Sequence, residues 1–180
     1  MLRKFIVLIF LIVRPGLALA FPNEPHGFGK ARFGMTVAEV KKIYPAMKEV
    51  GNPTPEVAAL LAVYQLEGQS VLGLKPCTVT FQFNPERLHQ VAFNCGTDMQ
   101  VMTTLEKRFG DPTQGMPNNA FWIGDSTAVS LNTKSRHFAF MDKKLNDEFQ
   151  ARLRKYVATH AVTGGAPAGE SGPTPAATPQ

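Results

Sequence analysis

The sequence lacks the motifs that identify most enzymes and cofactor-binding proteins. It has no Gly-x-Ser-x-Gly nucleophile elbow, no glycine-rich phosphate-binding loop and no His-Glu-x-x-His metal motif. Four histidines occur, and none has the spacing of a metal ligand relative to another; they are His26, His89, His137 and His160. We interpret them as isolated surface or turn residues. The sequence therefore predicts a non-catalytic protein with no cofactor and no metal site.

Charge is also sparse, and its balance changes along the chain. The formal net charge is +5, but three of the 19 basic residues, Arg3, Lys4 and Arg14, lie near the amino terminus. The other basic residues exceed the 14 acidic residues by only two, and they form no cluster that could follow a phosphate backbone. Nucleic acid is therefore not an expected partner.

Long apolar runs are absent except near the amino terminus, where residues 5–13 are apolar and follow a basic pair. The segment ends in Ala18-Leu19-Ala20, the Ala-x-Ala pattern of a signal-peptide cleavage site. The run is too short for a transmembrane helix, which needs ~20 apolar residues. We expect cleavage between Ala20 and Phe21 and a periplasmic or secreted protein without stable membrane insertion. A retained membrane anchor is the alternative.

Cysteine is nearly absent, and the only two, Cys77 and Cys95, bracket the segment CTVTFQFNPERLHQVAFNC. Folding this segment back about Glu86 places the two cysteines opposite each other, with a Pro85 turn between the strands. The same register pairs Val79 with Phe93, Phe81 with Val91 and Phe83 with His89. In an oxidising compartment this predicts a structural disulfide. The spacing fits neither a redox Cys-x-x-Cys motif nor a zinc-binding pair.

Strand alternation divides the hairpin into two faces. The predicted buried face holds the apolar residues Cys77, Val79, Phe81, Phe83, Val91, Phe93 and Cys95. The other face holds small or polar uncharged residues, namely Thr78, Thr80, Gln82, Gln90, Ala92 and Asn94. We therefore expect a half-buried, disulfide-closed hairpin.

The remaining elements are predicted from caps and periodicity. A Thr36–Glu39 capping box starts a helix over about residues 37–43, and Thr97 starts a second helix that ends near Gly110. Helices are also expected after Thr54 and over about 145–159. Further strands are expected at 62–74, with a bend at residue 68, and at 120–123, 127–131 and 136–141. Residues 21–30 are expected to be irregular.

The order of these elements defines the expected fold class. A helix followed by three strands occurs twice, and a final helix closes the chain. This indicates an α+β fold from a duplicated α-β-β-β unit, with an antiparallel sheet and helices on one face. We expect one domain over residues 21–162. Residues 163–180, rich in Pro, Ala and Gly, are expected to be disordered.

The outward face of this sheet is the candidate site. If Thr133-Lys134 forms a two-residue turn, Val129 pairs with Phe138 and Thr127 with Phe140. The outward set of the second half is then Ser126, Ala128, Ser130, His137, Ala139 and Met141. Uncharged side chains suit protein docking, and we predict a partner surface at Thr78, Thr80, Gln82, Gln90, Asn94, Ser130 and His137. The alternative is an ordinary solvated sheet surface.

Other roles also remain open at this point. Trp122 is either a partner contact or a residue buried under a neighbouring loop. The protein could instead be an envelope hydrolase or small-ligand binder with a pocket between the sheet and residues 51–62. It could also be a mainly structural domain with the tail as a spacer.

One short stretch carries a family resemblance. Residues 31–40, ARFGMTVAEV, are similar to the helix opening of small exported bacterial α+β proteins: the outer-membrane assembly lipoproteins and the β-lactamase-inhibitor-type domains. In the inhibitor-type domains the elements are duplicated and the sheet face docks a protein, so the resemblance implies a periplasmic interaction module that binds another envelope protein. Phe21 is not a cysteine, so a lipid anchor is not implied. No functional residue is carried over.

Overall fold

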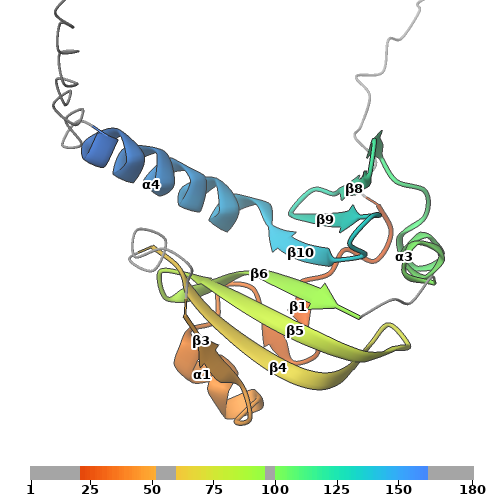
Figure 1. Ribbon diagram of the computed structural model, residues 1–180, viewed down its shortest axis with the longest axis horizontal. Helices are drawn as coiled ribbons and strands as arrows, with labels where there is room; N and C mark the ends of the chain where they lie inside the picture. Colours follow the sequence, from red (N-terminus) through yellow and green to blue (C-terminus); the bar gives the residue numbers. More distant parts are fainter. Residues whose placement is uncertain (1–20, 52–59, 96–99, 162–180) are drawn as a thin grey trace, which may run out of the picture.

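The structure, a computed structural model, describes residues 21–51, 60–95 and 100–161 (Figure 1). In these residues the helices are α1 (Val37–Ile43), α3 (Val101–Phe109) and α4 (Lys143–Ala161). The strands are β1 (Gly27–Phe28), β2 (Ala31–Arg32), β3 (Lys48–Val50), β4 (Ala62–Val71), β5 (Leu74–Asn84), β6 (Arg87–Asn94), β7 (Gln114–Met116), β8 (Asn119–Ile123), β9 (Thr127–Asn132) and β10 (Phe138–Asp142). The predicted signal peptide, the helix after Thr54, the Thr97 cap and the C-terminal tail lie outside the described residues.

The main sheet is antiparallel and has the strand order β3-β4-β5-β6-β10-β9-β8-β7. Helix α1 precedes the meander β3–β6, and α3 precedes the meander β7–β10. The last strands of the two meanders, β6 and β10, pair at the centre of the sheet. The predicted α+β class and the repeated order are confirmed, with one additional strand in each half. These edge strands, β3 and β7, have three residues each, which is too short for alternation to reveal them.

Helix α1 forms where its local sequence predicts it. The Thr36 hydroxyl accepts a hydrogen bond from the Glu39 N–H at 3.3 Å, and the Glu39 carboxylate accepts one from the Thr36 N–H at 2.8 Å. This capping box satisfies backbone donors that a helix start leaves open. The helix ends before Pro45, and it buries Val40 completely.

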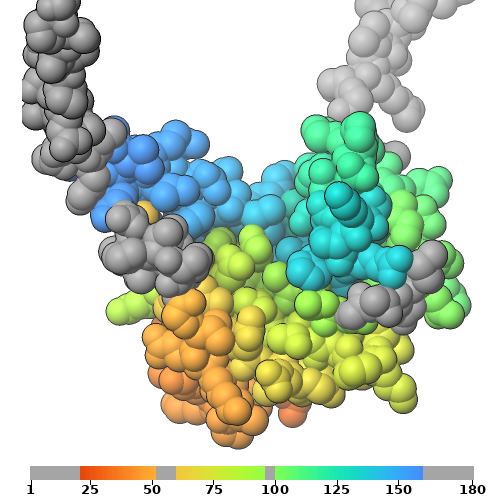
Figure 2. All heavy atoms as spheres, viewed as in Figure 1, coloured from red at the N-terminus to blue at the C-terminus, as the bar shows by residue number. Residues whose placement is uncertain are grey.

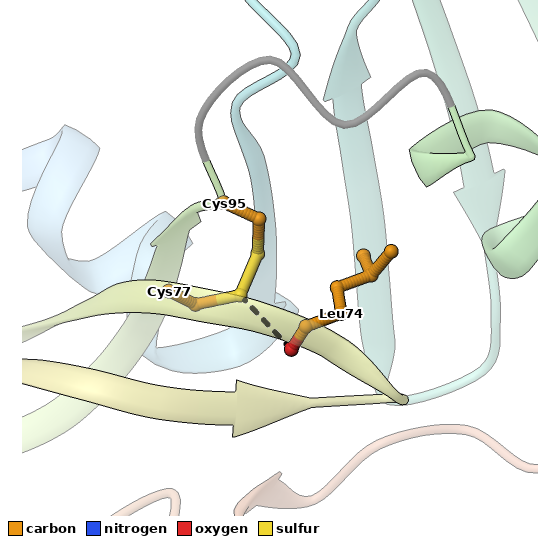
Figure 3. Close-up of a disulfide and its surroundings, with 3 residues drawn as sticks. All are labelled: Leu74, Cys77 and Cys95. Carbon is orange, nitrogen blue, oxygen red and sulfur yellow. Dashed lines mark hydrogen bonds between the residues drawn. A yellow bond between two sulfur atoms is a disulfide. The ribbon is translucent and has the colours of Figure 1, made fainter.

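A disulfide between Cys77 and Cys95 closes the open end of the β5–β6 hairpin (Figure 3). Both residues are buried, with 1% and 5% of their surface exposed. The Sγ of Cys77 also lies 3.4 Å from the carbonyl oxygen of Leu74. Because a disulfide sulfur carries no proton, we treat this as a close contact and not as a hydrogen bond.

The predicted register of the hairpin is right in its centre and wrong near its turn. Phe81 pairs with Val91 as expected, but Phe83 pairs with Leu88 and not with His89. A β-bulge at this point places one extra residue in β6. The bulge brings His89 into the protein interior, where it is 1% exposed, so its interpretation as a surface or turn residue is wrong.

The predicted register of β9 and β10 is shifted by two residues. Phe138 pairs with Leu131, and Phe140 pairs with Val129, because the connection is longer than a two-residue turn. The Asn132 side chain organises this connection by accepting hydrogen bonds from the N–H groups of Lys134 and Ser135 and from the Ser135 hydroxyl. Side chains alternate with a period of two, so a two-residue shift keeps every predicted face.

The core lies on one face of the sheet and joins both halves. Phe93 of β6 stacks on Phe138 of β10, with ring centroids 4.7 Å apart. Phe109 of α3 packs edge-on against Phe140 at 5.8 Å. Trp122 is fully buried on this face, and its Nε1–H donates to the Gly110 carbonyl at 2.7 Å. Burial beneath the loop after α3 is therefore confirmed, and a partner contact by Trp122 is wrong.

The segment before α1 also belongs to the core face, so the prediction of an irregular lead-in is partly wrong. β1 and β2 pair with each other, and Phe28 packs on Phe93 with ring centroids 5.6 Å apart. Phe21 is 5% exposed and packs edge-on against Phe109. Strands of two residues next to glycines give no periodic signal, so the sequence could not reveal this hairpin.

Helix α4 follows β10 directly and extends away from the sheet (Figure 1). Its first turns are fixed to the β5–β6 turn, since Asn84 Nδ2 donates to the Leu145 carbonyl at 3.1 Å and Arg152 donates to the Asn84 carbonyl at 3.3 Å. Within the described parts of the chain, no helix combines the length and apolar character needed to cross a bilayer.

Candidate functional site

The face of the sheet opposite the aromatic core, which we call the outer face, is continuous across both halves of the protein. Directly paired residues form a first row that crosses all eight strands: Lys48, Gln65, Thr80, Ala92, Ala139, Ser130, Phe121 and Gln114. A second row crosses seven strands: Val50, Val63, Gln82, Gln90, Met141, Ala128 and Ile123. Only Lys48, on edge strand β3, is charged.

The seam between the two halves has a floor of small residues. Ala92 pairs with Ala139 where β6 meets β10, and Ala139 pairs with Ser130. Ala139 and Ala128 expose only 9% and 7% of their surface. Small side chains at the seam leave room for the groove described below, which Ala92 lines. In Figure 2 the outline of the molecule is notched between α4 (blue) and the strands of the second half (green to teal).

A groove of about 320 Å³ borders the first row. Its lining residues are Gln65, Glu67, Thr78, Thr80, Ala92, Phe93, Asn94 and His137. Four residues predicted from the sequence, Thr78, Thr80, Asn94 and His137, therefore lie around one hollow. The other three, Gln82, Gln90 and Ser130, lie in the two rows. The structure brings the seven predicted residues to one face.

Hydrogen-bonding groups on the outer face remain accessible. The Gln65 amide donates to the Thr80 hydroxyl at 3.4 Å, which links β4 and β5. The side chains of Gln82, Gln90 and Ser130 are half-buried, and no other side chain of the described residues hydrogen-bonds to them. Amide and hydroxyl groups that make no hydrogen bond to other side chains can exchange water for a partner's polar groups at a low cost in free energy.

The outer face ends at the turn of the β5–β6 hairpin, where α4 packs against His89. The His89 ring packs against Phe149 of α4, with ring centroids 5.3 Å apart, and hydrogen-bonds to the Gln82 backbone. Its Nδ1 is buried without a hydrogen-bond partner among the described residues. Burial lowers the pKa of His89 to about 4, with a further contribution from Arg152, so the ring is neutral at neutral pH.

Potential metal ligands are scattered in the part of the chain that the structure describes. Across residues 21–51, 60–95 and 100–161, no group of three or more His, Cys, Asp or Glu side chains is arranged to hold a metal ion. His137 lies on the exposed rim and His89 in the interior, so these two histidines do not share a site. The alternative pocket beside residues 51–62 depends on residues 52–59, which lie outside the described residues.

Several members of the outer face were not predicted from the sequence. Phe121 and Ile123 are half-buried on this face, and alternation about Trp122 already assigned them to one side. Val63 and Gln65 of β4 complete the rows. Their membership depends on which strands are neighbours, and one sequence alone does not give strand order.

Comparison with family models matches residues 26–152 to the TP0088 domain. The match covers most of the chain, so the protein belongs to the TP0088 domain family. This family match gives no support to the resemblance between residues 31–40 and the outer-membrane assembly lipoproteins or the β-lactamase-inhibitor-type domains. No curated protein and no solved structure matches the chain. The family description states no activity, and the functional argument rests on the outer face.

Proposed function

We propose that this TP0088-domain protein is an exported, non-catalytic module that binds another protein through its outer face. The observation that carries the proposal is the pair of rows, uncharged apart from Lys48 at one edge, that crosses the β6–β10 seam without interruption. Seven inter-strand spacings of ~4.8 Å make this face about 34 Å wide. That width suits a specific protein interface, which typically buries about 800 Å² on each partner.

The chemistry of the face defines the kind of partner. The two rows supply amide and hydroxyl groups together with half-buried apolar side chains such as Val63, Phe121 and Ile123. Away from Lys48 at one edge and Glu67 in the groove, a charged partner residue would lose its hydration here without meeting an opposite charge, which costs binding energy. The proposed partner is therefore an envelope protein whose contact surface is uncharged and rich in hydrogen-bonding and aromatic side chains.

Site-specific photo-cross-linking in the native envelope tests this proposal. A photoreactive residue at Gln82 or Ser130, on the outer face, should give the same discrete protein adduct from both halves of the sheet. The matched controls are Ala38 on α1 and Thr103 on α3, which are exposed on the opposite side. Equal adducts from all four positions would contradict docking on the outer face.

Charge substitution gives the second arm of the test. The triple variant Thr80→Lys, Gln90→Lys and Ser130→Lys should fold, because these side chains are not in the core, and it should lose the adduct. The control variant Ala38→Lys and Thr103→Lys should keep it. If the folded triple variant retains the same adduct, the outer face is not the docking surface.

A further inference from the structure

A groove on the helical side of the molecule combines an apolar floor with a basic rim. Its volume is about 310 Å³, and its floor is formed by Phe28, Val71, Phe109 and Phe140. Arg32 and Arg108 line it together with residues 23–29 of the N-terminal segment. The β4–β5 turn and α3, which flank the groove, lie at the same end of the molecule (Figure 1). This volume is at the lower end of the range for small-molecule sites, ~300–1,000 Å³.

The charges around this groove are not balanced internally. Glu24 is the one carboxylate among the lining residues, and its oxygens already accept hydrogen bonds from Asp125, Ser126 and Thr127 on the β8–β9 turn. Arg32 and Arg108 are both exposed side chains. The lining therefore holds two positively charged guanidinium groups and one negatively charged carboxylate, which is already hydrogen-bonded within the protein. Its net charge is +1. A ligand with a single negative charge complements it.

An apolar side chain stands at the mouth of the groove in an unfavourable backbone conformation. Leu72 has φ +52° at the tip of the β4–β5 turn, and 38% of its surface is exposed. Asn, Asp or Gly would fit this left-handed conformation better than leucine. Leu72 and Arg108 also line an adjoining hollow of about 350 Å³, which includes Thr104 and Lys107. Leucine here therefore costs stability and gives an apolar contact at the basic rim.

We propose that this groove binds a single-chain fatty acid. Its carboxylate pairs with Arg32 and Arg108, and its aliphatic chain lies along Phe28 and Leu72. A free phosphate would leave the apolar floor of the groove without a contact. A peptide needs hydrogen bonds for its backbone, and Asn23 and Glu24, two of the lining polar side chains, already bond to the Arg108 carbonyl and the β8–β9 turn. The site is separate from the outer face.

Calorimetric titration of the purified protein with laurate below its micelle concentration tests the assignment. Laurate should bind, while butyrate, which lacks the chain, and dodecyltrimethylammonium, which inverts the charge, should bind at least about tenfold more weakly. Dodecyl phosphate and a tripeptide with a C-terminal leucine distinguish the other sources of an acid group. Tighter binding of either one, or no binding of laurate, overturns the proposal.

Variants identify the groove as the binding site. Arg32→Gln with Arg108→Gln should weaken laurate binding about tenfold or more, because each removes a charge-assisted hydrogen bond. Arg154→Gln with Lys155→Gln, on the exposed side of α4, is the matched control and should not change it. Leu72→Asn should keep or improve stability, since Asn tolerates positive φ, and should weaken binding severalfold. Unchanged affinity in both groove variants places the ligand elsewhere and overturns the proposal.

Discussion

The Glu24 carboxylate holds the turn at Ser126 from a hundred residues away in the sequence. One carboxylate oxygen accepts both the Ser126 N–H at 3.1 Å and the Ser126 hydroxyl at 3.0 Å. The N–H groups of Asp125 and Thr127 donate to the same carboxylate at 2.7 and 3.0 Å. An added Cβ at Gly124 would collide with it. This contact ties the N-terminal segment to the second half of the sheet.

Replacing Glu24 should therefore destabilise the protein and change its acid response. Glu24→Gln should lower the free energy of unfolding by about 1–3 kcal/mol, since it weakens hydrogen bonds to a charged acceptor. Burial opposes ionisation of Glu24, but the hydrogen bonds together outweigh it and lower its pKa. The stabilisation is therefore present above the ordinary pKa of 4.5 and is lost as pH falls through the lower folded value. Urea unfolding at several pH values measures both effects. Glu148→Gln, on exposed α4, is the control, and an equal loss in both variants would contradict the role of Glu24.

The buried His89 should make the stability of the protein depend on pH in a second range, separate from that of Glu24. Its pKa is about 4 in the folded protein against 6.5 for a free histidine, so the unfolded chain binds its proton more readily. The stability should therefore be full above pH 6.5 and should decline as pH falls towards 4, by at most about 3 kcal/mol. His89→Leu should flatten this part of the profile. His137→Leu, which replaces an exposed histidine, is the control variant; a profile that stays steep in His89→Leu would assign the acid response to other groups.

The face of each residue could be predicted from the sequence better than its register. Alternation assigned Val79 and Phe81 to the core and Thr80 and Gln82 to the outer face, and the structure agrees. Alternation does not determine the length of a turn. The β9–β10 register is therefore shifted by two residues, yet the faces are unchanged because the shift is even.

Features that depend on distant parts of the chain could not be predicted. At the β-bulge, the His89 ring packs against Phe149 of α4, about 60 residues further along the chain. The continuity of the outer face depends on pairing between Ala92 and Ala139, which belong to different halves of the chain. The groove at Arg32 and Arg108 joins the N-terminal hairpin to α3. Each of these juxtapositions is set by tertiary packing, and no local pattern records it.

The disulfide should be structural and inert. Replacing Cys77 and Cys95 by Ala should lower the free energy of unfolding by about 3 kcal/mol, because a closed loop of this size restricts the unfolded chain. The native protein should not react with a thiol reagent before denaturation, since both sulfurs are oxidised and buried. Denaturant titration and mass spectrometry of labelled protein measure these outcomes. Rapid reduction of the native bond by thioredoxin, without unfolding, would instead support a redox role.

Replacing two phenylalanines of the second half, one at a time, should distinguish an effect on stability from an effect on partner binding. Phe138 is 1% exposed and stacks on Phe93 across the β6–β10 seam, so Phe138→Ala should cost about 3–5 kcal/mol of stability. Phe121 is half-buried on the outer face, and Phe121→Ala should cost much less stability but should weaken the cross-link from Ser130, its paired neighbour. Thermal unfolding and cross-linking yield, measured on the same two variants, distinguish these effects. If Phe121→Ala unfolds the protein as readily as Phe138→Ala, the outer face is part of the core and cannot serve as a separate docking surface.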